Sequence, residues 1–362
     1  MTQYIQLHLL TAYAPSNLNR DDQGRPKTAK MGGVERMRIS SQSIKRAWRT
    51  SELFEEGLHQ ALGVRTRRLG REVYEWLQQG GMSEKQAFKV AQLIAAQFGK
   101  LKSEKKPKDA EQWDECINLE IEQLAHISHQ EWRDLKALCA SLGTEKREPN
   151  ADELQLLRKE NTSVDIALFG RMLASSPAFN VEAACQVAHA IGVSGSTVED
   201  DFFSAVDDLN KGADATGAGH IGEQGFGSAL YYTYLSLSRD LLLENLGGDE
   251  VLTRRAIAAL LESAVKVSPS GKQNSFASRA YADYVLAEVG TEQPRSLAVA
   301  FFKPVVGQDQ LASAIQRLRV QRDNLDKVYG PFVGDRMELC VPEGLGSFAE
   351  LQAFVCEPFA KP

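Results

Sequence analysis

The stretch YIQLHLLT, residues 4–11, is the segment from which the fold can be worked out. Apolar side chains alternate with polar ones at Gln6 and His8, and this period of two predicts a half-buried β-strand. A second stretch, ALYYTYLSL at residues 229–237, carries several tyrosines, which favour a sheet. Helical and glycine-rich segments lie between these stretches. We therefore expect one α+β sheet domain with two long excursions from the sheet.

The first excursion reads as helical from about residue 55 to 161. Ser83 and Ser128 are each followed three residues later by Gln or Glu, the spacing of a capping box at a helix start. Residues 163–168 then alternate in polarity again and predict a return to β-structure. Further helices are expected over residues 249–266, 308–328 and 347–356, and a further strand over 281–289.

The second excursion, residues 192–227, has an unusual composition. It contains eight glycines, acidic clusters at 199–201 and 207–208, and few large apolar side chains. Such a segment cannot contribute much to a core, so we expect a mobile arm or a long hairpin.

Composition narrows the class of protein. The chain has 362 residues, a net charge of −6 and 43% hydrophobic residues, which is ordinary for a globular protein. No apolar run reaches the ~18 residues that a membrane-spanning helix needs, and residues 1–10 carry no basic leader. We therefore expect a cytoplasmic protein that makes no membrane contact. The five cysteines form no Cys-x-x-Cys pair, which argues against a disulfide framework or a zinc ribbon.

A concentrated basic stripe follows the first strand. Residues 14–35 form a long polar stretch that reads as a functional or mobile loop, and residues 25–50 hold eight basic side chains and one acid. A helix is expected to begin at Ser40 or Ser41, with Lys45 and Arg49 on one face. The free N–H groups and the dipole at such a helix start suit a phosphate group. An ordinary solvated basic face remains the alternative.

Other clusters carry less information. Residues 65–71 hold a second basic group, Arg65, Arg67, Arg68 and Arg71. Acidic pairs such as Asp21-Asp22 could hold Mg²⁺ for phosphodiester cleavage, although such pairs are more often surface or capping groups. Cys116, His126, His129 and Cys139 lie too far apart for a zinc site, so we expect no metal and no cofactor.

Beyond these patterns, a series of motifs resembles the CasC family, the backbone subunits of the type I-E CRISPR surveillance complex, Cascade. In chain order the motifs are residues 18–22 (LNRDD), Gly32-Gly33, 38–47 (RISSQSIKRA), 164–168 (VDIAL), 170–172 (GRM), 188–190 (AHA), 203–209, 244–248 (ENLGG) and 271–273 (GKQ). The order and spacing cover nearly the whole chain. The helical block matches least, and there the functional residues of the family cannot be transferred.

This resemblance implies a hand-shaped subunit. A palm with a modified RRM or ferredoxin-like sheet would comprise residues 1–54, 162–191 and 228–362. Helical fingers would comprise 55–161, and a long thumb 192–227. Several copies would multimerise as a helical filament along a CRISPR RNA, pair the guide with target DNA and join other Cascade subunits in antiviral defence.

The resemblance also assigns residues. Contacts to the guide RNA are implied for Arg20, Lys27, Ser40, Gln42, Lys45, Arg46, Arg49, Arg171 and Met172. The last two match positions beside a displaced nucleotide. Phe203 and Ile221 of the thumb are implied as apolar groups that wedge against bases. Met172 and Phe203 could each instead be part of a core, which is the more frequent place for a lone Met or Phe.

Three functions stay open at this stage. We expect a non-catalytic RNA-binding scaffold, which relies on guide pairing to read its target. The alternative is a metal-dependent endoribonuclease of an RNA-targeting CRISPR effector, with Asp21 or Asp22 as the catalytic carboxylate. A generic single-stranded nucleic-acid binder that works alone is the third.

Overall fold

The computed structural model describes residues 2–58, 61–106, 112–159, 163–205 and 220–357. The chain divides into two compact units, which are described separately. Unit 1 comprises Met1–Glu56, Gln186–Ser238 and Ile257–Pro362, and unit 2 comprises Gly57–Cys185 and Arg239–Ala256. Unit 1 thus holds most of the residues expected in the palm and thumb. Residues 162–185, which we expected in the palm, belong instead with the helical unit.

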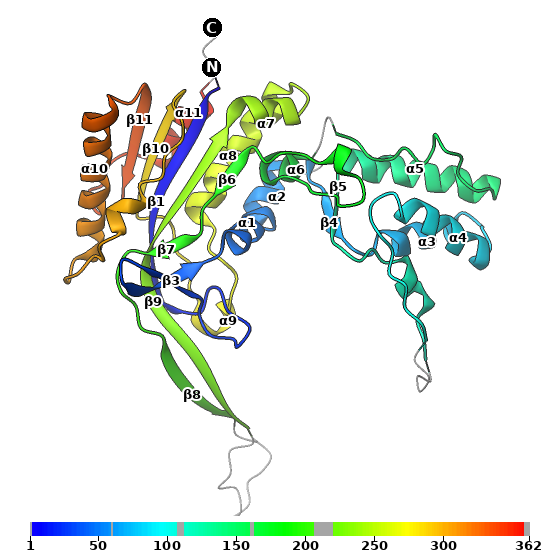
Figure 1. Ribbon diagram of the computed structural model, residues 1–362, viewed down its shortest axis with the longest axis horizontal. Helices are drawn as coiled ribbons and strands as arrows, with labels where there is room; N and C mark the ends of the chain where they lie inside the picture. The colour runs from blue at the N-terminus through cyan, green and yellow to red at the C-terminus, as the bar shows by residue number, and fades with distance from the viewer. Residues whose placement is uncertain (1, 59–60, 107–111, 160–162, 206–219, 358–362) are drawn as a thin grey trace, which may run out of the picture. The chain divides into compact units, whose positions relative to one another are not determined.

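Unit 1 is built on an antiparallel sheet, which confirms the expected α+β class (Figure 1). Within the described residues the strand order is β11–β10–β1–β9–β7–β3–β2, and β6 and β8 also pair with β9. The strands are β1 (Tyr4–Ser16), β2 (Thr28–Met31), β3 (Val34–Ile39), β6 (Cys185–Val187), β7 (Ala190–Gly192), β8 (Glu199–Ala205), β9 (His220–Ser238), β10 (Tyr284–Gly290) and β11 (Gly334–Cys340). The helices are α1 (Ser41–Arg49), α9 (Gln273–Phe276), η4 (Ala298–Phe301), α10 (Gln310–Tyr329) and α11 (Phe348–Cys356). Two more helices, α2 (Glu52–Leu58) and α8 (Glu250–Lys266), each contain residues of both units.

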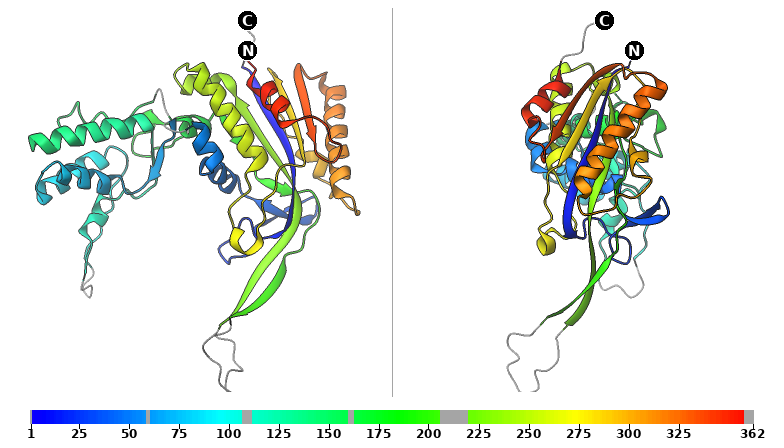
Figure 2. Two further views of the ribbon diagram at one scale, coloured as in Figure 1. Left: turned by 180° about the vertical axis from the view of Figure 1, so that it is seen from behind. Right: turned by 90° about the vertical axis from the view of Figure 1, so that its left-hand side faces the viewer.

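The central strand β1 is buried on both faces, so the expectation of a half-buried strand was wrong. Leu10 packs with Tyr232 and Leu286 in a cluster that includes Ile315 and Leu318 of α10. The alternate residues Ile5, Leu7 and Leu9 point to the other face of the sheet, where α8 and α11 lie (Figure 2). The polar residues Gln6 and His8 are 1% and 0% exposed.

His8 is accommodated by a directional hydrogen-bond chain. The Tyr232 hydroxyl accepts the N–H of Leu297 at 3.0 Å and donates to Nδ1 of His8 at 2.8 Å. Nε2 of His8 then faces the Glu288 carboxylate at 3.3 Å, and Arg295 pairs with the same carboxylate at 2.9 Å. Burial lowers the pKa of His8, against the opposing effect of Glu288, so the imidazole is neutral and carries its proton on Nε2.

The polar stretch expected as one loop contains a hairpin. Strands β2 and β3 are joined by Gly32 and Gly33, whose φ angles are 61° and 83°. Two consecutive positive φ angles in a two-residue turn suit glycine, because a side chain would be strained there. At Gly32 a Cβ atom would also lie 1.7 Å from the carbonyl oxygen of Phe302, so no other residue fits.

Unit 2 is mainly helical, as expected for the first excursion. Its helices are α3 (Leu69–Gln79), α4 (Glu84–Ala95), η2 (Glu115–Leu119), α5 (His129–Glu145), α6 (Val164–Phe169), η3 (Pro177–Phe179) and α7 (Arg239–Asn245), and its small sheet pairs β4 (Val64–Thr66) with β5 (Ala125–Ile127). The predicted capping box at Ser128 is present, whereas the Ser83 side chain makes no capping hydrogen bond. Helices α3, α4 and α5 share one apolar core.

The strand predicted over residues 163–168 is wrong, because Val164–Phe169 form helix α6. Ser163 is the N-cap of α6, and Gly170 ends the helix with a φ of 81°. Each residue from Val164 to Leu168 is buried, including Asp165. Alternating polarity carries no information about secondary structure where both kinds of side chain are buried. Among the described residues, no helix combines the length and the apolar character needed to cross a bilayer.

Candidate nucleic-acid interface

The start of α1 is fixed by side chains from distant parts of unit 1. The Ser40 hydroxyl accepts the N–H of Ser43 at 3.3 Å, which confirms Ser40 as the N-cap. The N–H of Ser40 donates to Oδ1 of Asn19 at 2.9 Å. Ser40 is buried and its hydroxyl is used in the cap, whereas Gln42 is exposed on the first turn. Contacts of Ser40 and Gln42 with RNA stay predictions.

The two faces of α1 differ as the sequence predicted. Ile44 and Trp48 are 4% and 3% exposed and line a small cavity of about 30 Å³ against the sheet. Arg46 is exposed, and Lys45 and Arg49 are partly exposed. Because Arg46 and Arg49 lie in the last turn, they also interact favourably with the helix dipole. The helix therefore presents its cations without weakening its contact with the core.

The loop before β2 is held in shape by its own side chains. Asn17 donates its amide to the carbonyl oxygens of Gly24 and Gly225 at 3.0 and 2.9 Å. Lys27 donates its N–H to the Asn19 carbonyl at 2.8 Å, and Arg20 forms a bridge with Pro26. Arg20 is exposed and Lys27 partly exposed. Loop and helix α1 thus lie together in unit 1 and share Asn19 as their connection.

The same loop contains the acidic pair considered for catalysis. Oδ1 of Asp21 accepts the N–H groups of Gln23 and Arg25 at 3.0 and 2.9 Å, the pattern of an aspartate that stabilises a turn. Asp22 is exposed. In the described part of the chain, no group of three or more His, Cys, Asp or Glu side chains is arranged to hold a metal ion.

His189 joins this surface, and the sequence analysis quoted it within the 188–190 motif but assigned it no role. Its Nδ1 accepts the N–H of Ser41 at 3.0 Å and lies 3.5 Å from Nη1 of Arg38. Burial, and after it the charges of Arg38 and Lys27, lower the pKa of His189. The neutral ring therefore keeps Nδ1 as an acceptor, which leaves the proton on Nε2. A lone histidine between two alanines gives no sequence signal for such a contact.

Arg171 lies in unit 2, and its side chain is used inside the protein. Its guanidinium pairs with the Glu131 carboxylate at 2.8 Å, and the two side chains are 1% and 0% exposed. Further donors reach the carbonyl oxygens of Phe179 and His126 at 3.1 and 3.3 Å. In this structure Arg171 is a positioning residue that holds the segment after α6. It has no exposed donor for a phosphate, and its contact with RNA stays a prediction.

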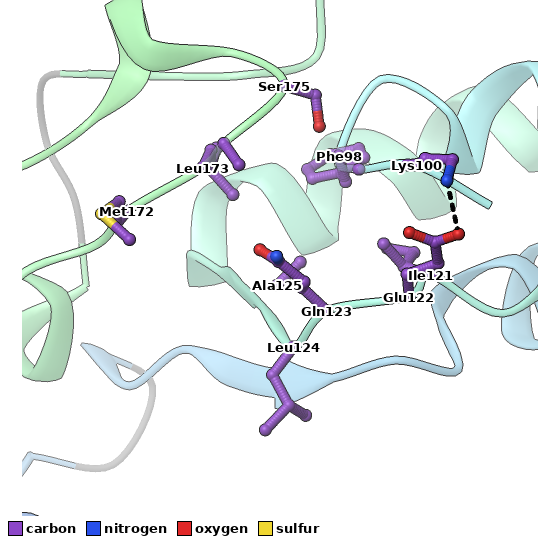
Figure 3. A pocket seen from close by; sticks show the side chains of 12 residues that line it. Phe98, Lys100, Ile121, Glu122, Gln123, Leu124, Ala125, Met172, Leu173 and Ser175 are labelled. Atoms are coloured by element: carbon purple, nitrogen blue, oxygen red, sulfur yellow. Dashed lines mark ion pairs between the residues drawn. The ribbon is translucent and has the colours of Figure 1, made fainter. Parts of the chain in front are cut away.

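Met172, the next residue, has the opposite environment. Its side chain is 80% exposed and lies at the edge of a cavity in unit 2 (Figure 3). A methionine with this exposure does not belong to the core, so the core alternative does not apply to it. The structure places Arg171 and Met172 in unit 2, and the other predicted guide contacts in unit 1.

The arm is a two-stranded hairpin, formed by β8 and the first half of β9 (Figure 1). Phe203 is 46% exposed and stands opposite Gly222, where a Cβ would lie 2.4 Å from its ring. Phe202 is 71% exposed and was missed in the sequence analysis. Ile221 pairs with Ser204 through the backbone, but its side chain lies outside the described residues, as do residues 206–219.

Comparison with known proteins identifies the family. Residues 5–350 match the family described as CT1975-like protein, Cas_CT1975, and the chain belongs to this family. A solved structure described as a CRISPR RNA-guided surveillance complex, pre-nicking, contains a chain with 32% sequence identity and a TM-score of 0.83. That match covers 98% of this chain and 99% of the other.

A second solved structure, described as a CRISPR RNA-guided surveillance complex, contains a chain with 27% identity and a TM-score of 0.74. It covers 98% of this chain and 99% of that chain. A comparison with curated proteins found no match. The similarity therefore extends over the whole length of both related chains and includes both units of this one.

Proposed function

We propose that this chain is a non-catalytic backbone subunit of a type I-E CRISPR RNA-guided surveillance complex. Several copies bind along one CRISPR RNA and present it for pairing with target DNA. The observation that carries the proposal is the end-to-end similarity to a chain of such a complex, at 32% identity. A palm of the RRM or ferredoxin-like kind and assembly into a helical filament are part of the same proposal.

The geometry of unit 1 supports binding to an RNA backbone. Cations at Arg20, Lys27, Lys45, Arg46 and Arg49 lie on one loop and one helix that share Asn19 as a connection. Contacts with phosphates position a nucleic acid without reading its sequence, as a subunit that repeats along any guide requires. Target choice then rests on base pairing between guide and target.

The salt dependence of RNA affinity tests this surface. The double variant Lys45→Ala/Arg49→Ala removes two charges from α1 and leaves Ile44 and Trp48 in place. On single strands each lost phosphate contact changes the slope of log affinity against log salt by about 0.7, so we expect a change of about 1.4. The double variant Lys303→Ala/Lys327→Ala removes two exposed charges elsewhere in unit 1 and is the matched control.

Guides of different sequence should lose affinity equally, because phosphates carry no base information. An unchanged slope in a folded α1 variant would exclude this helix from the RNA groove. Co-purification with the tagged chain, followed by sequencing of the bound RNA, tests the wider proposal. Repeat-derived guides are expected, and random cellular RNA would contradict it.

The alternative is a metal-dependent endoribonuclease that uses Asp21 or Asp22. The Asp21 carboxylate accepts two backbone N–H groups, from Gln23 and Arg25, and so stabilises its own turn. This structural role favours the scaffold over the nuclease. Asp22 is exposed and is the better candidate for the alternative. Complementary RNA and Mg²⁺ added to the assembled complex should give no discrete cuts. Cuts that Asp22→Ala abolishes would replace the scaffold with the nuclease.

A further inference from the structure

The side chain of Arg36, on β3, is fully buried in unit 1. It is 0% exposed, and no carboxylate among the described residues pairs with it. Its Nε atom is also buried and has no hydrogen-bond partner in the described part of the chain. Withdrawing a guanidinium from water is costly, so a buried one persists only where other groups stabilise its charge. The groups around Arg36 therefore indicate what this charge does.

Backbone carbonyl groups take the place of an anion around Arg36. Its Nη1 atom donates to the carbonyl oxygen of Gly192 at 3.0 Å, and its Nη2 atom donates to that of Phe301 at 3.2 Å. The carbonyl oxygen of Phe302 lies 3.5 Å from the same Nη2 atom. Phe301 is the last residue of η4 and Phe302 is its C-cap, and carbonyl groups at a helix end have no partner inside the helix. The planar guanidinium thus joins two segments that are far apart in the sequence.

The first of these segments is the root of the arm, residues 192–196, which runs from the end of β7 towards β8. Its first carbonyl group, that of Gly192, is bound by Arg36. At the other end of the root, Ser196 donates its N–H to the carbonyl oxygen of Glu35 at 3.1 Å. Strand β3 therefore holds both ends of the root, one through the side chain of Arg36 and one through the backbone of the residue before it.

The second segment, which follows η4, holds the middle of the root. The N–H of Val305 donates to the carbonyl oxygen of Val193 at 2.9 Å. The N–H of Val193 in turn donates to the carbonyl oxygen of Leu230, on β9, at 2.9 Å. The root of the arm is therefore held by β3, by β9 and by the segment after η4.

The arm is also linked to the basic loop that precedes β2. Asn17 donates its amide to the carbonyl oxygen of Gly225 on β9 at 2.9 Å, and Arg25 pairs with Asp200 on β8 at 3.0 Å. Strand β3 itself continues directly into Ser40, the N-cap of α1. The arm (Figure 1) is thus joined to the proposed guide-binding loop and helix at its root and along both of its strands.

A buried cation is rarely the most stabilising side chain for a position in a core. Replacing buried charged groups by apolar side chains of similar size is often neutral or stabilising. An apolar side chain, however, could not hold carbonyl groups of two segments at a fixed angle, whereas the rigid fork of donors in a guanidinium can. What Arg36 supplies is therefore a fixed geometry at the root of the arm.

We propose that Arg36 is a positioning residue for guide binding, which fixes the root of the arm and so sets the direction of the arm relative to the guide-binding loop and helix. Arg36 itself does not contact RNA. The proposal rests on the proposed function in so far as the arm acts on a guide RNA, whereas the fixed arm is a property of the free chain. An arm that already has its bound direction loses less conformational entropy on binding.

Distances between spin labels in the free full-length chain test the arm first. Nitroxides at Glu223→Cys on the arm and Gln316→Cys on α10 are measured by double electron–electron resonance, and both positions are exposed. Cys116→Ser and Cys356→Ser remove the two cysteines that are not buried. Arg36→Met should shift and broaden the distance distribution. Arg36→Lys, which keeps the charge but not the planar fork, should do the same to a smaller extent.

Arg171→Met is the matched control, because it removes a buried guanidinium from unit 2 and leaves unit 1 unchanged. It should keep the label distance of the parent. An unchanged distance in folded Arg36→Met, checked by circular dichroism, would overturn the proposal. If Arg36→Met does not fold, Arg36→Lys decides in the same way, because a purely stabilising residue would lower the melting temperature without moving the arm of the folded chain.

Guide binding by the same variants tests the second half of the proposal. Because Arg36 contacts no phosphate, the salt slope of RNA affinity in Arg36→Met should equal that of the parent. The apparent Kd should rise as the fraction of molecules with the parent arm distance falls, so it should about double when half of them have left it. A changed slope would overturn the proposal, since Arg36 would then contact RNA directly.

These outcomes distinguish the role of Arg36 from the function of the whole chain. A moved arm with unchanged guide affinity would overturn the role of Arg36 in guide binding, and the scaffold would stand. Absence of repeat-derived guides from the parent and from every variant would refute the proposed function and with it this role, although the label distances would still decide whether Arg36 fixes the arm. A moved arm, an unchanged slope and a proportionate loss of affinity would together support the proposal.

Discussion

The substitution Arg171→Met tests whether Arg171 stabilises the fold or contacts RNA directly. Its guanidinium donates to both oxygens of Glu131, at 2.9 and 2.8 Å, and both side chains are buried. Breaking a buried ion pair by removing one partner costs about 3–5 kcal/mol. Glu131 keeps the N–H groups of Ser128 and Arg158, each at 2.7 Å, so we expect the lower end, about 3 kcal/mol.

At about 2–4 °C per kcal/mol, this loss lowers the melting temperature by about 6–12 °C. The free energy of unfolding is measured by urea unfolding followed by tryptophan fluorescence. Trp76 and Trp132 report on unit 2, where they pack edge to face with ring centroids 5.3 Å apart. Met172→Ala is the matched control, because that neighbouring side chain is exposed and its loss should cost less than about 0.5 kcal/mol. Adding Glu131→Gln to Arg171→Met should recover part of the stability, because no uncompensated buried charge then remains.

The refuting result is equally definite. If Arg171→Met unfolds within about 0.5 kcal/mol of the parent and yet loses affinity for the guide, the ion pair with Glu131 contributes little. Arg171 would then act on RNA directly, as the family resemblance implies. A destabilised variant that still binds the guide at low temperature would assign the residue to the fold alone.

Burial would raise the pKa of Glu288, but the hydrogen bond from His8 and the charge of Arg295 outweigh it and lower the pKa to about 2. The stabilisation from this carboxylate is therefore complete above the usual pKa of 4.5 and is lost as the pH falls towards 2. In urea titrations from pH 5 to about pH 2, the free energy of unfolding should fall in the parent and depend less on pH in Glu288→Gln. Burial lowers the pKa of His8 below 6.5, so the unfolded chain binds the proton first and stability should fall as the pH drops below about 6.5; proton NMR of the His8 ring should show it neutral at pH 7. Gly222→Ala should displace the ring of Phe203, because the added Cβ would lie 2.4 Å from it, and should change the chemical footprint on bound guide RNA while the melting temperature stays constant.

Local patterns predicted the elements whose causes are local. Helix α1 begins where Ser40 can cap it and buries the face that Ile44 and Trp48 form, and both features lie within one short stretch of sequence. Strand β1 was also predicted, but the prediction that it is half-buried was wrong. The polar residues Gln6 and His8 read as solvent-facing, whereas their partners Tyr234, Tyr232 and Glu288 lie far along the chain.

The candidate site was predictable to the same extent. The basic stripe of residues 25–50 is a matter of composition, and the structure places most of it on one loop, one hairpin and one helix. The contact of His189 with Ser41 could not be predicted, because it forms only after β7 has paired with β3. Arg171 was assigned from a motif, but its environment is set by Glu131, which enters from the start of α5.

The loop that carries Arg20 and Lys27 is held in shape by hydrogen bonds from its own side chains. Asn17 and Asp21 use their side chains to close its turns, and Asn19 ties it to the first residue of the α1 cap. Immobilising a loop and its side chains on binding costs free energy, and that cost falls when the free protein already holds the bound conformation. A subunit that binds at many positions on one strand incurs this cost in every copy. If several copies of the chain bind one guide RNA, as proposed, the small polar residues of this loop contribute to affinity although they carry no charge that attracts a phosphate, and each bound copy adds the same contribution to the free energy.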